Sequence, residues 1–201
     1  LAIIRGVGEV AKRHGVRAAM KFQFRQLDTF IHPAHHKGSN NKHIPRFLKT
    51  QLAESQYQIL LDEVRRQGML AICTPFDEES VGVIERMGFD LLKIASCSAK
   101  DWPLIERTAK SGLPIIFSTG GLTFTNIDNL VSFLEHRSIE FAIMHCVAIY
   151  PTPDGDCQLN QIDLLSARYP NVTIGWSTHE PPHVIAQVMV AAAKGARMFE
   201  R

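Results

Sequence analysis

Apolar and polar residues alternate along the chain with two different periods. Residues 2–14 and 49–67 carry the 3.6-residue spacing of amphipathic helices, and each segment is followed by a glycine that marks a helix end. Residues 28–45 show no usable hydrophobic period, so we expect a loop there. Similar spacing predicts further helices at residues 78–87, 102–111, 125–135, 162–168 and 183–194.

Short apolar runs between these helices predict strands. They cover residues 17–24, 69–73, 89–95, 114–117, 140–146, 172–176 and 196–199. Regular strand–helix alternation predicts parallel strands with right-handed crossovers. Polar groups follow almost every strand, which disfavours a flavodoxin-like open sheet with one switch point.

We therefore predict an α/β fold, a TIM (β/α)8 barrel, with residues 1–201 forming part of one domain. Such a barrel usually takes about 250 residues. The chain begins with a predicted helix and ends on a predicted strand. We therefore expect the first strand and the closing helix to lie outside a chain that is a fragment of a longer protein.

Composition narrows the class of protein. Apolar residues make up 45% and charged residues 21% of the 201 residues, as in soluble globular proteins. A net charge of +2 without a basic stripe disfavours nucleic-acid binding, and no long apolar run suggests a membrane span. The N-terminus is too interrupted by charge for a signal peptide. Four cysteines without a C-x-x-C pair favour reduced thiols and a cytoplasmic protein.

Chemically capable side chains lie in or just after the predicted strands. They are Lys21, Gln23, Thr74, Asp77, Lys93, Ser96, Ser118, His145, Tyr150, Ser177 and His179. In a barrel these positions converge on one mouth. Two lysines with several hydroxyls and loop amides predict a site for a multiply charged anion, such as a phosphate with a carboxylate.

Structural interpretations compete with these functional ones. Lys21 and Lys93 are favoured as functional because an unpaired ammonium in an apolar strand is costly. The serines equally suit helix caps. His179, at the start of a loop, is the better candidate metal ligand, whereas His145 suits a hydrogen-bonded core histidine equally well. The four histidines between residues 32 and 43 are expected to be solvated.

Six motifs along the chain are specific as an ordered set. They are M-K-F-Q, T-P-F-D, L-K-I-A-S, P-I-I-F-S-T-G, H-C-V-A-I-Y-P-T-P and G-W-S-T-H. In this order, over roughly residues 17–200, the chain resembles the sialic acid synthase family, which includes legionaminate and pseudaminate synthases and spore-coat polysaccharide proteins. The resemblance implies an enzyme that condenses phosphoenolpyruvate with an N-acylated hexose such as N-acetylmannosamine. The implied products are a nine-carbon sialic-acid-type sugar and phosphate, and the implied cofactor is Mn²⁺ or Mg²⁺.

The same resemblance implies a role for each matching residue. Lys21 and Lys93 would hold the carboxylate and phosphate, Tyr150 would line the sugar site, and His179 would bind the metal. The residues that would complete the phosphoenolpyruvate pocket are Gln23, Thr74, Ser96, Ser118 and Ser177. A second metal histidine would lie beyond Arg201. The resemblance also implies a homodimer in the full-length form, and the antifreeze-like domain that follows the barrel in many members is absent from this chain.

The chain departs from the family pattern at Ser98, Val147, Ala148 and Thr178. These departures keep two alternatives open. One is a Schiff-base aldolase in which Lys21 or Lys93 is the nucleophile. The other is a degenerate barrel that binds a ligand without turnover.

Overall fold

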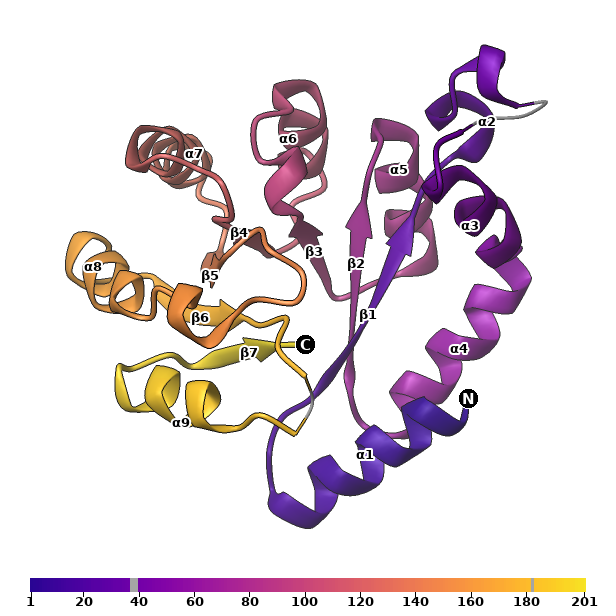
Figure 1. Ribbon diagram of the computed structural model, residues 1–201. Helices are drawn as coiled ribbons and strands as arrows, with labels where there is room; N and C mark the ends of the chain where they lie inside the picture. Colours follow the sequence, from indigo (N-terminus) through magenta and orange to yellow (C-terminus); the bar gives the residue numbers. More distant parts are fainter. Residues whose placement is uncertain (37–39, 182) are drawn as a thin grey trace. The chain divides into compact units, whose positions relative to one another are not determined.

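The computed structural model describes residues 1–36, 40–181 and 183–201 (Figure 1). The chain forms two compact units, Leu1–Leu91 and Leu92–Arg201, and each has its own packing. Within the described ranges, no helix is both long enough and apolar enough to cross a membrane.

The first unit combines two parallel strands with helices. In chain order its elements are α1 (Ala2–His14), β1 (Ala19–Phe24), α2 (Leu27–Phe30), the 3-10 turn η1 (Pro33–His35), α3 (His43–Thr50), α4 (Glu54–Arg66), β2 (Leu70–Pro75) and α5 (Glu78–Met87). The helices predicted at residues 2–14 and 78–87 are confirmed to the residue. They end at Gly15 and Gly88, whose φ angles of 62° and 71° lie in the left-handed region that glycine adopts without strain.

The predictions for residues 28–67 are wrong in two respects. The predicted loop contains helical turns, namely most of α2, all of η1 and the first turn of α3, while its residues 37–39 lie outside the described residues. The helix predicted at residues 49–67 is in fact the end of α3 followed by α4. Backbone at Gln51 and Ala53 is extended, and the Gln56 side chain accepts a hydrogen bond from the Ala53 N–H at 2.9 Å. No glycine or proline marks this break, so the hydrophobic spacing alone gave no sign of it.

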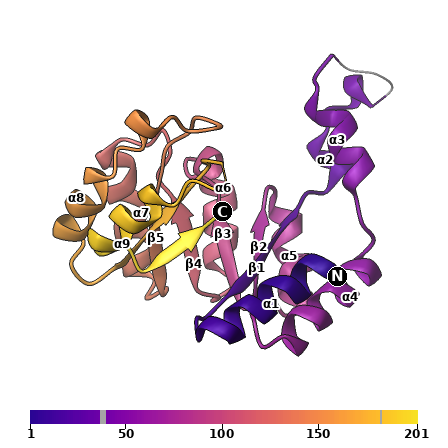
Figure 2. The same ribbon diagram turned by 60° about the horizontal axis from the view of Figure 1, so that its bottom comes forward.

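Aromatic rings and a close helix pair hold the first unit together. Phe24 on β1 packs edge-on against Tyr57 of α4 and against Phe89, with ring centroids 4.4 and 5.6 Å apart. Figure 2 shows α1 beside α4. Gly8 allows this approach, because a Cβ there would lie 2.8 Å from the Cβ of Gln67.

The second unit continues the alternation of strand and helix. Its elements are β3 (Leu91–Ile94), the turn η2 (Ser96–Ser98), α6 (Trp102–Ala109), β4 (Ile115–Ser118), α7 (Phe124–His136), β5 (Phe141–Cys146), the turn η3 (Asp154–Asp156), α8 (Asn160–Arg168), β6 (Thr173–Ser177), α9 (Ala186–Ala193) and β7 (Met198–Glu200). Each strand pairs in parallel with the next along the chain, from β3 to β7. The predicted parallel α/β architecture is therefore confirmed, and its sequential order is consistent with the predicted (β/α) barrel.

Helix starts in both units follow local capping chemistry. The side chains of Asp77, Asp101 and Thr123 each accept a hydrogen bond from the backbone N–H three residues on, at the beginning of α5, α6 and α7. The helix predicted at residues 183–194 is shorter in the structure and begins only at Ala186. In the second unit the helices lie outside the strands (Figure 1), and the core between them includes Phe117 and Trp176, which are fully buried.

Candidate functional site

In the first unit, the strand register brings three of the predicted site residues together. Gln23 of β1 lies opposite Thr74 of β2, and Lys21 lies two residues before Gln23. Because alternate residues of a strand share a face, the side chains of Lys21, Gln23 and Thr74 belong to one face of this strand pair. Thr74 is 1% exposed, and among the described residues no atom hydrogen-bonds its Oγ1. A buried hydroxyl in this state is suited to contact a ligand.

In the second unit, the register sorts the strand residues onto two faces. The paired positions from β4 to β7 place four side chains on one face, those of Ser118, Cys146, Ser177 and Glu200. Lys93 of β3 lies on the same face, because it pairs with Ile116, which is two residues before Ser118 on β4. Lys93, Ser118 and Ser177 are each 4% exposed. The structure therefore gathers one cation and two hydroxyls of the predicted site on a single buried face.

Lys93 forms an ion pair that the sequence did not suggest. Its Nζ contacts Oε2 of Glu200, linking β3 to β7, and the two side chains are 5% and 24% exposed. Buried charges in proteins are usually paired in this way because desolvating a lone charge is costly. The carboxylate thus fixes the ammonium of Lys93 within the face that carries the hydroxyls.

Ser96 and Cys146 both lie close to Gly120, in the loop that follows β4. A Cβ at Gly120 would lie 3.2 Å from Ser96 Oγ, 3.3 Å from Cys146 Sγ and 3.4 Å from Ala148 Cβ. Any larger residue at position 120 would push against these atoms. Gly120 therefore keeps the loop after β4 close to the side chains of Ser96 and Cys146.

His179 and Tyr150 meet at the edge of this group. Their ring centroids are 4.1 Å apart, and His179 Nε2 lies 3.8 Å from Cys146 Sγ. Tyr150 is 65% exposed. Burial raises the pKa of the Cys146 thiol, while the Ser177 hydrogen bond and the charge of Lys93 oppose that rise. Burial thus disfavours the thiolate form of Cys146, which packs beside His179.

His145 lies on the opposite face of the strands from this group. It pairs with Trp176, is 4% exposed, and its Nε2 lies 2.9 Å from the backbone carbonyl oxygen of Cys157. Burial lowers the pKa of His145, so the neutral ring donates this N–H to the carbonyl. Of the two interpretations open from the sequence, the geometry favours the core histidine.

Sequence reasoning missed Cys146 and Glu200 as members of the group. Cys146 was counted only among the four cysteines expected to be reduced thiols, and Glu200 lies at the end of a strand of only three residues. The pairing of Glu200 with Lys93, 107 residues earlier, depends on tertiary structure.

The described residues do not by themselves fit the divalent metal that the resemblance implies. Among them, no group of three His, Cys, Asp or Glu side chains could hold a metal ion. His179 is one imidazole beside a thiol and a phenol ring, whereas Mn²⁺ and Mg²⁺ favour several oxygen ligands. We therefore derive no step of the reaction through a metal.

Comparisons with known proteins identify the relatives of the chain. The model of the NeuB family matches residues 8–201. N-acetylneuraminate-9-phosphate synthase of Drosophila melanogaster is 34% identical over 152 residues, which cover 75% of this chain and 40% of the fly protein. The chain therefore spans less than half of that curated relative.

Comparisons with solved structures agree with this match to the NeuB family. A Chromobacterium violaceum protein assigned to spore coat polysaccharide biosynthesis is 46% identical with a TM-score of 0.96, covering 100% of this chain and 60% of its own. N-acetylneuraminic acid synthetase from Leptospira borgpetersenii, in complex with citrate, is 28% identical with a TM-score of 0.83, covering 98% of this chain and 66% of its own. The resemblance found from the six motifs is thus confirmed, and the chain belongs to the NeuB family.

Proposed function

We propose that the full-length protein condenses phosphoenolpyruvate with an N-acylated hexose, of the N-acetylmannosamine type, to give a nine-carbon sialic-acid-type sugar and phosphate. Family membership supports the reaction class. The observation that carries the proposal for this chain is the shared face of Lys93, Ser118 and Ser177 in the second unit. A buried cation among hydroxyls suits a phosphorylated carboxylate.

The bonds made and broken fit such a site. C3 of phosphoenolpyruvate forms a bond to the aldehyde carbon of the sugar, whose oxygen takes up a proton. Water adds to C2, where positive charge has developed, and loses a proton. The bond from C2 to the bridging oxygen then breaks as the new C2 hydroxyl loses its proton and becomes the ketone oxygen, and phosphate leaves with the electron pair of the broken bond. The substrate is an anion throughout, so positioning and charge neutralisation are the main tasks of the protein.

Each residue receives a role within that scheme. We assign Lys93 to the phosphate or carboxylate of phosphoenolpyruvate, with Glu200 orienting its ammonium and with Ser96, Ser118 and Ser177 donating hydroxyl hydrogen bonds. In the first unit, Lys21, Gln23 and Thr74 are assigned to the same substrate. Tyr150, which is exposed and whose ring lies against that of His179, is assigned to the sugar.

Phosphate release is the direct assay. Full-length protein is incubated with phosphoenolpyruvate and a panel of N-acylated hexoses, and inorganic phosphate is measured over time. We expect release that requires both substrates. Repeating the assay with EDTA, and then with Mn²⁺ or Mg²⁺ restored, tests the need for a divalent cation, and the role of His179 as one of its ligands, that the resemblance implies. No sugar-dependent release with any acceptor would support the non-catalytic alternative.

Variants then test the residues. Lys93→Ala and Lys21→Ala should each lower phosphate release by about 100-fold or more, because an anion loses a charge partner. Lys110→Ala, which changes an exposed lysine of the second unit, is the control and should leave the rate unchanged. Calorimetric affinity for phosphoenolpyruvate that is unaltered in Lys93→Ala would refute the assignment.

Borohydride trapping with pyruvate separates the proposed reaction from the Schiff-base alternative. A Schiff base requires a neutral amine, whereas Lys93 is an ammonium paired with Glu200. We therefore expect no covalent adduct by mass spectrometry. An adduct on Lys93 or Lys21 would favour the aldolase instead.

A further inference from the structure

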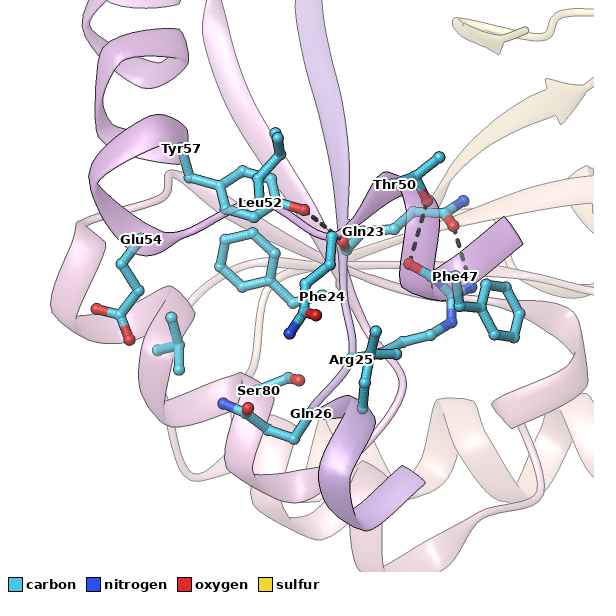
Figure 3. Close-up of a pocket in the computed structure, with 13 residues that line it drawn as sticks. Gln23, Phe24, Arg25, Gln26, Phe47, Thr50, Leu52, Glu54, Tyr57 and Ser80 are labelled. Carbon is cyan, nitrogen blue, oxygen red and sulfur yellow. Dashed lines mark hydrogen bonds between the residues drawn. The ribbon is translucent and has the colours of Figure 1, made fainter. Parts of the chain in front are cut away.

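A pocket of about 140 Å³ lies within the first unit, near the end of β1 (Figure 3). Its walls come from the end of β1, from α3, from the connection between α3 and α4, and from α4 and α5. On a comparable measure a single water needs only about 10–15 Å³, so the pocket has room for a small molecule. In the view of Figure 3, Leu52 and Tyr57 lie at the top and Gln26 and Ser80 at the bottom.

Arg25 is the cation of this pocket, and aromatic rings hold it in place. Its guanidinium carbon lies 3.7 Å from the centroid of Phe76 and 4.5 Å from that of Phe47. Its Nη2 also donates to Gln23 Oε1 at 3.1 Å. Stacking between rings fixes the plane of a guanidinium and so fixes the directions of its N–H donors.

Ser80 supplies a buried hydroxyl to the same pocket. It is 1% exposed, and its backbone N–H donates to Asp77 Oδ1 at 2.7 Å as part of the cap of α5. Among the residues that the structure describes, none hydrogen-bonds the Oγ of Ser80. Buried hydroxyls are rarely left in this state, because the lost bond to water is costly. A ligand in the pocket would restore that bond.

The other lining groups limit the class of ligand. Glu54 also lines the pocket, and its carboxylate pairs with Arg86 at 3.4 Å. Arg25 is the single cation among the lining residues that the structure describes, so the lining offers little compensation for the two charges of a phosphate. An apolar ligand would leave the Gln26 amide and the Ser80 hydroxyl without partners. A sugar both donates and accepts hydrogen bonds at each hydroxyl, and its C–H faces can pack on rings such as that of Tyr57. We propose that this pocket binds a neutral, hydroxyl-rich molecule of the monosaccharide class, with Ser80 Oγ as one of its hydrogen-bonding groups.

This site goes beyond the condensation proposed above, because Arg25, Gln26 and Ser80 have no assigned role in that reaction, although Gln23 lines the pocket as well. The two proposals therefore fail separately. Sugar binding in this pocket does not depend on phosphoenolpyruvate, and Ser80→Ala should leave phosphate release unchanged at saturating substrates. A protein that binds sugar but never releases phosphate would overturn only the condensation.

Saturation-transfer NMR on the whole chain provides the test, with glucose, N-acetylglucosamine and inorganic phosphate as probes. We expect a titratable signal from one or both sugars. Ser80→Ala should weaken that binding by about threefold to tenfold, the usual effect of one hydrogen bond. Leu52→Trp, which puts a larger side chain at the pocket wall, should abolish it. Ser55→Ala, an exposed serine on α4 outside the pocket, is the matched control and should bind like the unaltered chain.

Three results would overturn the proposal. They are the absence of sugar binding, affinity that is unchanged in both Ser80→Ala and Leu52→Trp, and binding of phosphate through this pocket in place of either sugar. Circular dichroism on each variant ensures that a lost signal reflects the pocket and not unfolding. If Leu52→Trp fails to fold, the comparison of Ser80→Ala with Ser55→Ala still decides the question.

Discussion

Lys93 on β3 pairs its ammonium with the carboxylate of Glu200 on β7, so the cation proposed to hold the substrate is itself held by a second strand of the same unit. The pair spans the sheet from its first strand in this unit to its last. A substitution that moves either β3 or β7 is therefore expected to move the ammonium of Lys93.

Removing one partner of this pair should be more damaging than removing both. Glu200→Gln leaves the ammonium of a 4% exposed lysine without its carboxylate, and we expect a loss of about 3 kcal/mol in the free energy of unfolding. The double variant Lys93→Met with Glu200→Met should recover much of that loss. Urea denaturation measures both. Asp163→Asn removes the partner of Lys194 in an ion pair at the surface, and it should cost less than about 1 kcal/mol.

Two glycines of α1 should respond in opposite ways to the same substitution. Gly8→Ala places a methyl group 2.8 Å from Gln67 Cβ and should cost about 1–3 kcal/mol through forced separation of α1 and α4. Gly6 has no atom within 4 Å of the position of a Cβ. Gly6→Ala should therefore stabilise the helix, by up to about 1 kcal/mol. Thermal unfolding of the two variants compares them directly, and equal shifts would contradict the packing described.

The network around Glu63 predicts a dependence of stability on pH. Hydrogen bonds from Arg5 and Gln67 lower the pKa of Glu63 below its ordinary value of 4.5. Because the pKa is depressed in the folded state, this contribution is complete above pH 4.5 and disappears as pH falls through the folded value. Glu63→Gln should thus be less stable than the unaltered chain at pH 7, and the difference should shrink in acid. A difference that is constant down to pH 3 would rule out this role.

Tyr150 should act through its ring and its hydroxyl to different extents. Tyr150→Phe keeps the ring contact with His179, whereas Tyr150→Ala removes both the ring and the hydroxyl. We expect kcat/KM for the sugar to fall by about tenfold or more in Tyr150→Ala and by less in Tyr150→Phe. The KM for phosphoenolpyruvate should change little in either variant. An equal effect on both substrates would point to a general structural role for Tyr150.

Local sequence chemistry was enough to locate most elements. The helices ending at Gly15 and Gly88 were predicted to the residue, because periodic apolar side chains end at a glycine with positive φ. The alternation of strand and helix predicted parallel pairing, and six ordered motifs identified the family. The expectations that a first strand and a closing helix lie outside the chain, and that a metal takes part, stay predictions.

Tertiary structure decided what spacing could not express. The break between α3 and α4 has no glycine or proline signal, and it depends on the Gln56 side chain bonding the Ala53 backbone. The order His145-Cys146 does not reveal which side chain joins the site, since neighbours in a strand point to opposite faces and only the register with Trp176 and Ser177 assigns the faces. The sequence by itself determined most of the elements, the family and the candidate residues, because these depend on local spacing and residue type. The pairing of Lys93 with Glu200 and the unpaired hydroxyl of Ser80 required the folded chain, because they join residues that no local pattern connects.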